Sequence, residues 1–457
     1  MAPVLPGRMM LTPRHGKGSA ETGAAGGRHT LAILGSLCFF LSALEYLIPK
    51  PFPFMRIGLA NLPLLLALDI FSPADFFLLV LLKILGQGIL TGTLFSYVFL
   101  FSLAGTASSA VLMYALRRAA GPGRSGYTGI SCAGAMLSNG VQLVLARFFV
   151  FGADLRFLVP AFLVSGFASG AALGIFCEIF CGSSRWYGRY AAAGTRLPAT
   201  GTSPPSAGTS PPAEIRRTPP EPPPAPADDR HLRRRQRWND LFGSTELFIA
   251  GLVMTLFLVF NPSPLLRLPQ FLFFCFLARL SGKKNNPLVT ALVMAFIVFF
   301  NLLAPHGKIL AALGPLKVTD GSLLSGFGKA LTLEGLVMLS GACVKADLKL
   351  PGGFGSLLGE SFRLLEVIRG RKTAVRRGHV IEGIDRLMLE LDAAAETESA
   401  SPAALSAAGP SAGAGRAAGP VPASVIRQGA GQKTRAALLL AGMVIAAALP
   451  VLPSFFR

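Results

Sequence analysis

Long apolar blocks, separated by basic and proline-rich stretches, dominate the pattern of this chain. Six apolar segments come first, at about 30–48, 57–71, 74–91, 94–116, 128–151 and 156–181. Each is close to, or somewhat below, the roughly 20 residues that a helix needs to cross a bilayer. The second is short enough to pack obliquely or to re-enter. The pattern predicts an all-α integral membrane protein that begins with a six-helix bundle.

A second apolar region follows a proline-rich interruption. Its segments lie at about 244–260, 265–280, 287–304 and 321–344, with a last one at 436–452. This predicts a second helical membrane region of about four to five spans. Between the last two segments, the spacing of Phe362, Leu365 and Ile368 is typical of an amphipathic helix.

The blocks and the stretches between them define the expected domain organisation. Runs such as Pro222–Pro223–Pro224 favour extended, disordered chain, because proline-rich segments cannot form a packed core. The expected parts are a disordered basic N-terminus (1–28), a six-helix membrane domain (29–184), a disordered basic linker (185–240), a second membrane domain (241–345), cytoplasmic amphipathic helices (346–392), a low-complexity linker (393–430) and a C-terminal membrane helix (431–457).

The distribution of charge predicts how the chain is oriented in the membrane. The chain of 457 residues is 52% hydrophobic and 14% charged, with a net charge of +20. A soluble basic protein would suggest nucleic acid as a partner, but here the basic clusters lie between apolar blocks. With a cytoplasmic N-terminus, nearly all of them fall on one side, as the positive-inside rule requires. We therefore expect a multi-pass protein of the bacterial inner (cytoplasmic) membrane, with the lipid bilayer and no nucleic acid as a partner.

The main exception is the first outer loop, which carries Lys50 and Arg56 against the charge trend. Three prolines within five residues stiffen this loop. Glu45 and Asn61 flank it at the same membrane face. These charges either sit in a rigid interfacial turn or are retained to bind a ligand.

Polar residues inside apolar segments are the other candidates, because they are costly in a membrane. Lys83 and Gln87 are four residues apart, hence on one face of the third segment. Lys83 could pair with Asp69 or Glu45 and lock the bundle, or it could bind an anionic group of a substrate.

The fifth segment carries a second pair of polar residues. Asn139 and Gln142 share one helix face, beside small residues that allow close helix approach. Their amides either join helices or orient a polar ring or amide of a ligand. The candidate substrate-binding residues are thus Arg56, Asn61, Lys83, Gln87, Asn139 and Gln142.

Motifs for intrinsic catalysis are missing from the sequence. Prenyl elongation needs Mg²⁺ held by clustered aspartates, and the chain has no Asp-Asp-x-x-Asp motif. It has no Walker-type phosphate loop either. Cys177 and Cys181 are one turn apart, with no further ligand nearby to complete a metal site. We therefore expect no catalytic residues, no metal and no cofactor.

Several spaced motifs carry a family resemblance over residues 30–181. They are Pro49-Lys-Pro-Phe-Pro, Arg56-Ile-Gly-Leu-Ala-Asn61, Gly92-Thr-Leu-Phe-Ser96 and Gly129-Ile-Ser-Cys-Ala-Gly134, together with Lys83, Asn139 and Gln142. This part resembles the Gx transporter family, also catalogued as heptaprenyl diphosphate synthase component I. That family is similar to the substrate-binding S components of energy-coupling factor transporters, which have six membrane helices. Ser138 stands where the family pattern has His, which bears on solute specificity.

The second half resembles the T component of the same transporters. The matching residues are Phe299-Phe-Asn301, Thr319-Asp-Gly-Ser and Ala330-Leu-Thr-Leu-Glu-Gly335. The resemblance implies coupling to ATPase subunits, although Ile368-Arg-Gly370 only approximates the coupling signature of a T component. Two alternatives to transport of a small solute stay open. One is a non-catalytic membrane component of a polyprenyl (heptaprenyl) diphosphate synthase system, and the other is a membrane scaffold.

Overall fold

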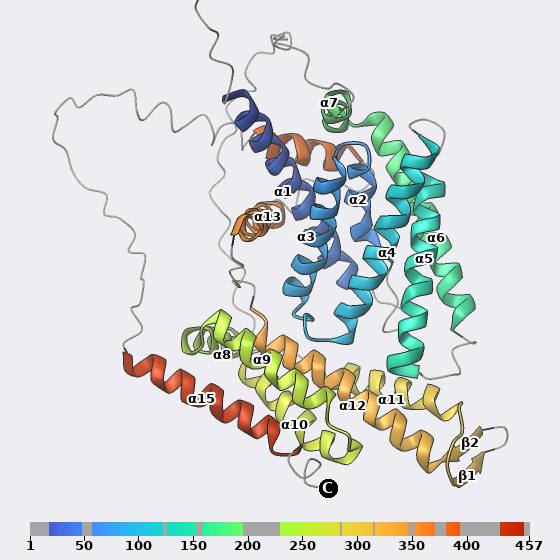
Figure 1. Ribbon diagram of the computed structural model, residues 1–457, viewed down its shortest axis with the longest axis vertical. Coiled ribbons are helices and arrows are strands. Elements are labelled where there is room, and N and C mark those ends of the chain that lie inside the picture. Colours follow the sequence, from blue (N-terminus) through green and yellow to red (C-terminus); the bar gives the residue numbers. More distant parts are fainter. Residues whose placement is uncertain are drawn as a thin grey trace, which may run out of the picture.

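A computed structural model describes residues 18–47, 57–121, 126–151, 158–194, 229–283, 286–313, 316–345, 348, 352–370, 381–393 and 430–451. Arg56, Lys50, most of the proline-rich linker and the low-complexity linker lie outside these residues. The described chain is almost entirely helical, which confirms the predicted all-α membrane fold (Figure 1). One short hairpin, β1 (Ile309–Leu313) with β2 (Leu316–Thr319), is the exception, and the apolar pattern did not predict it.

The first half forms an upright bundle. Its helices are α1 (Gly18–Leu47), the short pair η1 (Leu59–Asn61) and α2 (Leu62–Ala67), α3 (Pro73–Thr91), α4 (Tyr97–Ala120), α5 (Tyr127–Ala146) with a π-helical extension η2 (Arg147–Phe151), and α6 (Val159–Ser183). Five of these, α1, α3, α4, α5 with η2, and α6, are long and apolar enough to cross a membrane. The second predicted segment contains only the six-residue helix α2.

Local chemistry sets the ends of these helices. Ser72 caps α3 by accepting a hydrogen bond from the Asp75 backbone N–H, and Pro73 occupies the first turn. The same helix ends at Gly92, whose φ of 64° is readily adopted by glycine. Helices α5 and α6 pack closely because small residues face each other. A β-carbon at Gly170 would lie only 2.8 Å from the Cα of Cys132.

The second half contains α8 (Asp229–Leu241), α9 (Ser244–Val259), α10 (Pro264–Leu280), α11 (Pro287–Leu302), α12 (Asp320–Cys343) and α15 (Ala430–Ala448). Within the described residues, α12 alone of these is a candidate span by itself, and α8 and α9 form a pair bent by 91°. These helices lie across one end of the bundle (Figure 1). Ser340 of α12 accepts a hydrogen bond from the backbone N–H of Phe95, at 3.1 Å, in the α3–α4 turn.

Two further segments of the second half, α13 and the helical segment 381–393, pack on the bundle. Helix α13 (Gly352–Gly370) lies against α1, where Phe362 meets Phe39 with ring centroids 4.9 Å apart. Helix α7 (Arg185–Gly194) follows α6 and starts inside the predicted linker. Asp385, in the helical segment 381–393, accepts a hydrogen bond from the backbone N–H of Trp186 at 2.9 Å and so caps α7. The predicted amphipathic stretch is therefore a docked part of the fold.

Candidate solute-binding cavity

A polar cavity lies inside the N-terminal bundle, enclosed by α1, η1, α3, α4, α5 and α6. We call it the central cavity. Its lining includes Glu45, Asn61, Lys83, Gln87, Thr106, Ser109, Met113, Ser131, Ser138, Asn139, Gln142 and Leu173. Measured as the space open to the centres of water molecules, its volume is about 40 Å³. That is room for a few water molecules, so a larger solute requires the helices to move apart.

Five of the six residues proposed from the sequence line this one cavity. Asn61, Lys83 and Gln87 come from η1 and α3. Asn139 and Gln142 come from α5. The sixth, Arg56, lies outside the described residues. Helical spacing alone placed Lys83 with Gln87, and Asn139 with Gln142, but it could not show that the two pairs face each other.

Lys83 is 3% exposed and donates to polar groups from two other elements. Its Nζ donates to Oδ1 of Asn61, and also to Oγ1 of Thr106 at 3.4 Å. Gly58, whose φ is 83°, makes the tight turn that turns Asn61 toward α3. The alternative in which Lys83 pairs with Asp69 is wrong, because Asp69 binds other groups at the end of the bundle.

The amide of Gln142 depends on a glycine for its position. Nε2 of Gln142 donates to Oγ of Ser138 at 3.0 Å, one turn earlier in α5. A β-carbon at Gly105 of α4 would lie 2.8 Å from that same Nε2. Helix α4 therefore leaves room for the amide only because position 105 has no side chain. Ser138, the departure from the family pattern, thus lies in the central cavity.

The Asn139 amide joins two helices, which is one of the two roles that the sequence left open for it. Its Nδ2 donates to the backbone carbonyl of Phe162 in α6 at 2.8 Å. Gly166 lies beside it, since a β-carbon there would be 2.6 Å from Nδ2. The amide thus joins α5 to α6 while its residue borders the central cavity.

Sequence reasoning missed the hydroxyl groups of α4. Thr106 and Ser109 are buried, three residues apart, and both line the central cavity. Their spacing on one helix face was a usable signal. Hydroxyls carry weak information in an apolar helix, however, because most bond to the preceding turn of their own backbone, as Ser108 does to Gly105.

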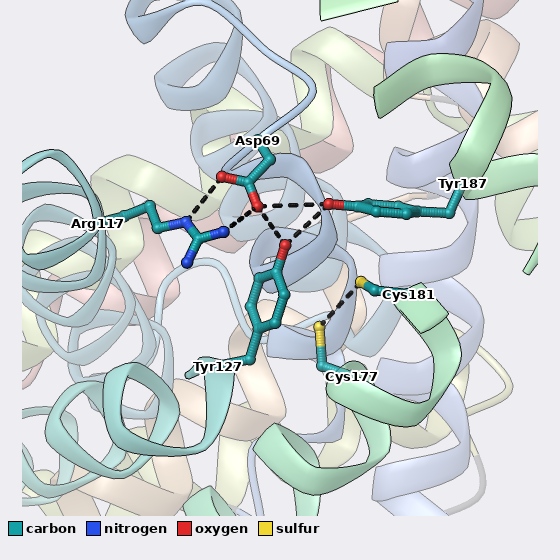
Figure 2. A network of polar contacts seen from close by, with 6 residues as sticks. All are labelled: Asp69, Arg117, Tyr127, Cys177, Cys181 and Tyr187. Atoms are coloured by element: carbon teal, nitrogen blue, oxygen red, sulfur yellow. Dashed lines mark hydrogen bonds and ion pairs between the residues drawn. The ribbon is translucent and has the colours of Figure 1, made fainter. Parts of the chain in front are cut away.

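A separate polar network lies at the end of the bundle that is farthest from the α3–α4 turn (Figure 1). Figure 2 shows its side chains. Asp69 receives two hydrogen bonds from Arg117, at 2.7 and 2.6 Å, and further ones from the hydroxyls of Tyr127 and Tyr187. Burial disfavours the charged form of Asp69, but the bonds from Arg117 and Tyr127 outweigh it and lower its pKa. This network links the turn after α2 to α4, α5 and α7, and it places Asp69 at the end of the bundle where α4 ends and α5 begins.

In the described part of the chain, no group of three or more His, Cys, Asp or Glu side chains could hold a metal ion. Cys177 and Cys181, with sulfur atoms 3.9 Å apart, lie beside the Asp69 network (Figure 2). Their carboxylate neighbour, Asp69, is occupied by Arg117.

These features define a polytopic helical membrane protein with a polar cavity in its first bundle. Comparison with known families adds that residues 34–180 match the family described as heptaprenyl diphosphate synthase component I. Residues 247–346 match a second family, a domain of unknown function (DUF8519). No curated protein and no solved structure matches the chain.

Proposed function

We propose that this protein is a membrane transport protein whose N-terminal bundle binds a small solute in the central cavity. The observation that carries the proposal is the cavity itself. Lys83 and Gln142 are 3% and 4% exposed, yet both polar residues line the same cavity. Buried polar groups are expensive in a membrane bundle and are retained mainly where they serve a ligand or pathway.

The second half would couple the bundle to partner subunits. In this proposal it corresponds to a T component and the first half to an S component of an energy-coupling factor transporter, with ATPase subunits as partners. The contact between Ser340 and the α3–α4 turn supports direct coupling, since a shift of α12 would move the end of α3. Gln87, which lines the central cavity, lies one turn before that end.

The proposed location is the bacterial inner membrane, with the N-terminus in the cytoplasm. The basic residues at the Asp69 end of the bundle support this orientation. The basic helix α8 and Lys283 oppose it, because they lie at the other end, where the second half covers the α3–α4 turn (Figure 1). Arg117 and Arg118 end α4 at the same bundle end as the Asp69 network. In this orientation the network lies at the cytoplasmic face, and the α3–α4 turn lies toward the outer face.

Small-molecule analysis of the purified full-length protein tests the function. The protein is purified from a host membrane, denatured, and its released small molecules are identified by mass spectrometry. We expect a solute that is released by the wild type and reduced at least tenfold in Gln142→Met, because that change removes the amide from the cavity wall.

A matched control separates binding from folding. Gln270 is also a buried glutamine, 1% exposed, but it lies in α10 and its amide is paired on both sides, with Asn261 and with the carbonyl of Ala447. Gln270→Met should lower thermal stability and leave the released solute unchanged. Equal solute release from wild type and Gln142→Met, at equal folded protein, would contradict the proposed function.

The match to heptaprenyl diphosphate synthase component I favours one second candidate, a non-catalytic membrane component of a polyprenyl diphosphate synthase system. The chain has no Asp-Asp-x-x-Asp motif of its own, so the catalytic aspartates would belong to a partner. Co-purification of a prenyl synthase, with no solute and no ATPase subunit, would favour this candidate.

A further inference from the structure

Three residues that line the central cavity each carry a buried polar atom without a hydrogen-bond partner among the residues that the structure describes. These atoms are Oε1 of Gln87, Oγ of Ser109 and Oε1 of Gln142. Ser109 is 1% exposed and Gln142 is 4% exposed. Most buried polar groups in proteins are paired, so three unpaired groups around one space indicate that something else pairs with them.

These atoms belong to cavity-lining residues of three different helices, α3, α4 and α5. Ser109 is fixed beside Gly134, where a β-carbon would lie 2.9 Å from its Oγ. Gln142 is fixed against Gly105 and bonded to Ser138. The groups are therefore held by close helix packing, and a bound molecule meets them in a defined arrangement.

The chemistry of the unpaired atoms specifies what that molecule must supply. The two glutamine Oε1 atoms are amide carbonyl oxygens, which accept hydrogen bonds and cannot donate them. The Ser109 hydroxyl can do either. The ligand must therefore bring at least two donors, and it can use one acceptor.

The described charges of the cavity make an anion a poor fit. Lys83 already donates to Asn61 and Thr106. The carboxylate of Glu45 lines the same cavity and accepts from the backbone N–H of Ile57 at 2.9 Å. A phosphate or diphosphate would place more acceptors against two amide oxygens and a carboxylate, where each would remain unpaired.

We propose that the central cavity binds an uncharged amide or ureide, whose N–H groups donate to Gln87 and Gln142 and whose carbonyl accepts from Ser109. This inference rests on the proposed function, because it names the chemical class of the solute for that cavity. The small volume of the cavity points to a compact molecule around which the helices part slightly.

Thermal unfolding of the purified full-length protein with defined probes tests the ligand class. The probes are uracil and hydantoin, two ureides of different ring size, each at millimolar concentration. Their N,N-dimethyl derivatives keep the carbonyls and remove the N–H donors. We expect either ureide to raise Tm by on the order of 1–3 °C, with no shift from the methylated forms.

Variants locate the effect. Ser109→Ala removes one hydroxyl with little risk to folding, and Gln142→Met removes an acceptor. Both should at least halve the shift, whereas Gln270→Met should keep it. The ligand class is overturned if the methylated probes stabilise as well as the parents, if inorganic pyrophosphate stabilises the protein instead, or if no probe shifts Tm.

These outcomes can be told apart from failure of the proposed function. If pyrophosphate stabilises the wild type and Gln142→Met abolishes that effect, the cavity is a solute site of another class. If solute release is the same for wild type and Gln142→Met, the proposed function fails, whatever the probes do.

Discussion

The Asp69 network gives the most direct prediction about stability, through the substitution Asp69→Asn. The change keeps the size of the side chain and removes its charge. Arg117 then keeps its charge in a site where its side chain is 12% exposed, while the position of Asp69 is 23% exposed. Tyr127 and Tyr187 lose their charged acceptor as well.

The magnitude follows from burial. Removing one partner of a fully buried ion pair costs about 3–5 kcal/mol, whereas an exposed pair contributes about 0–1 kcal/mol. With both partners mostly but not fully buried, and one carboxylate oxygen replaced by an amide that cannot accept, we expect Asp69→Asn to destabilise the bundle by about 2–3 kcal/mol. Glu390→Gln is the control, because Glu390 pairs with Arg386 on an exposed helix face and should cost roughly 0.5 kcal/mol or less.

Denaturant unfolding in detergent, followed by tryptophan fluorescence, measures this difference. Trp186 is fully buried in α7, next to Tyr187, so it reports on the same region. A double-mutant cycle with Arg117→Met should recover a large part of the loss as coupling energy. An Asp69→Asn protein within about 0.5 kcal/mol of wild type would refute the role assigned to the network.

The pH dependence of this difference has a defined sign. The pKa of Asp69 is lowered in the fold, so its contribution is fully present above its unfolded pKa of about 3.9. It is lost as pH falls through the lower, folded pKa. Wild type and Asp69→Asn should therefore differ at pH 7 and converge in strongly acidic buffer.

Four further predictions concern the central cavity, the contact between the halves, and topology. Lys83→Met should reduce solute release sharply at near-normal folded yield, because it removes the bonds that hold Asn61 and Thr106 at the cavity wall. A collapse of yield with unchanged binding per folded molecule would make Lys83 structural. Gly105→Ala should displace Gln142 and weaken binding, whereas Gly140→Ala, with open space around it, should not. Ser340→Ala should cost about 1–3 kcal/mol in unfolding experiments, because it leaves the buried N–H of Phe95 unpaired. A cysteine introduced at Ser206 should resist an impermeant thiol reagent in intact cells, and labelling from outside would reverse the proposed topology.

The sequence predicted the helical class and most of the bundle, because long apolar blocks have few alternatives in a membrane protein. It also predicted two side-chain pairs of the central cavity from helical periodicity. Both inferences depend on spacing along one helix, such as Lys83 with Gln87. Composition and spacing along one helix are enough to predict the helical class and these pairs, because neither depends on how the helices pack.

Partners between helices were harder to predict. Asp69, Lys83 and Arg117 are distant in the sequence, and only the fold shows that Asp69 pairs with Arg117. The unpaired hydroxyl of Ser109 was missed for the same reason. The β1–β2 hairpin has strands of five and four residues, and β1 is apolar throughout, so it lacks the alternation that marks a half-buried strand. The 91° bend between α8 and α9 leaves no apolar signature.

The docking of α13 on α1 has a consequence for how the chain can be divided. His29 and Glu360 lie 2.9 Å apart, and a β-carbon at Gly35 would be 2.9 Å from Oγ of Ser361. Segments that follow the proline-rich linker thus pack on α1 and, through Ser340, on the α3–α4 turn. A protease cut at about residue 210 should leave two fragments that stay together, and separately expressed pieces, 1–210 and 211–457, should reassemble into one complex. The fragment 1–210 alone would expose the apolar side of α1 that α13 covers. The fraction of this fragment that aggregates in detergent, with and without fragment 211–457, would measure how strongly the second fragment stabilises it.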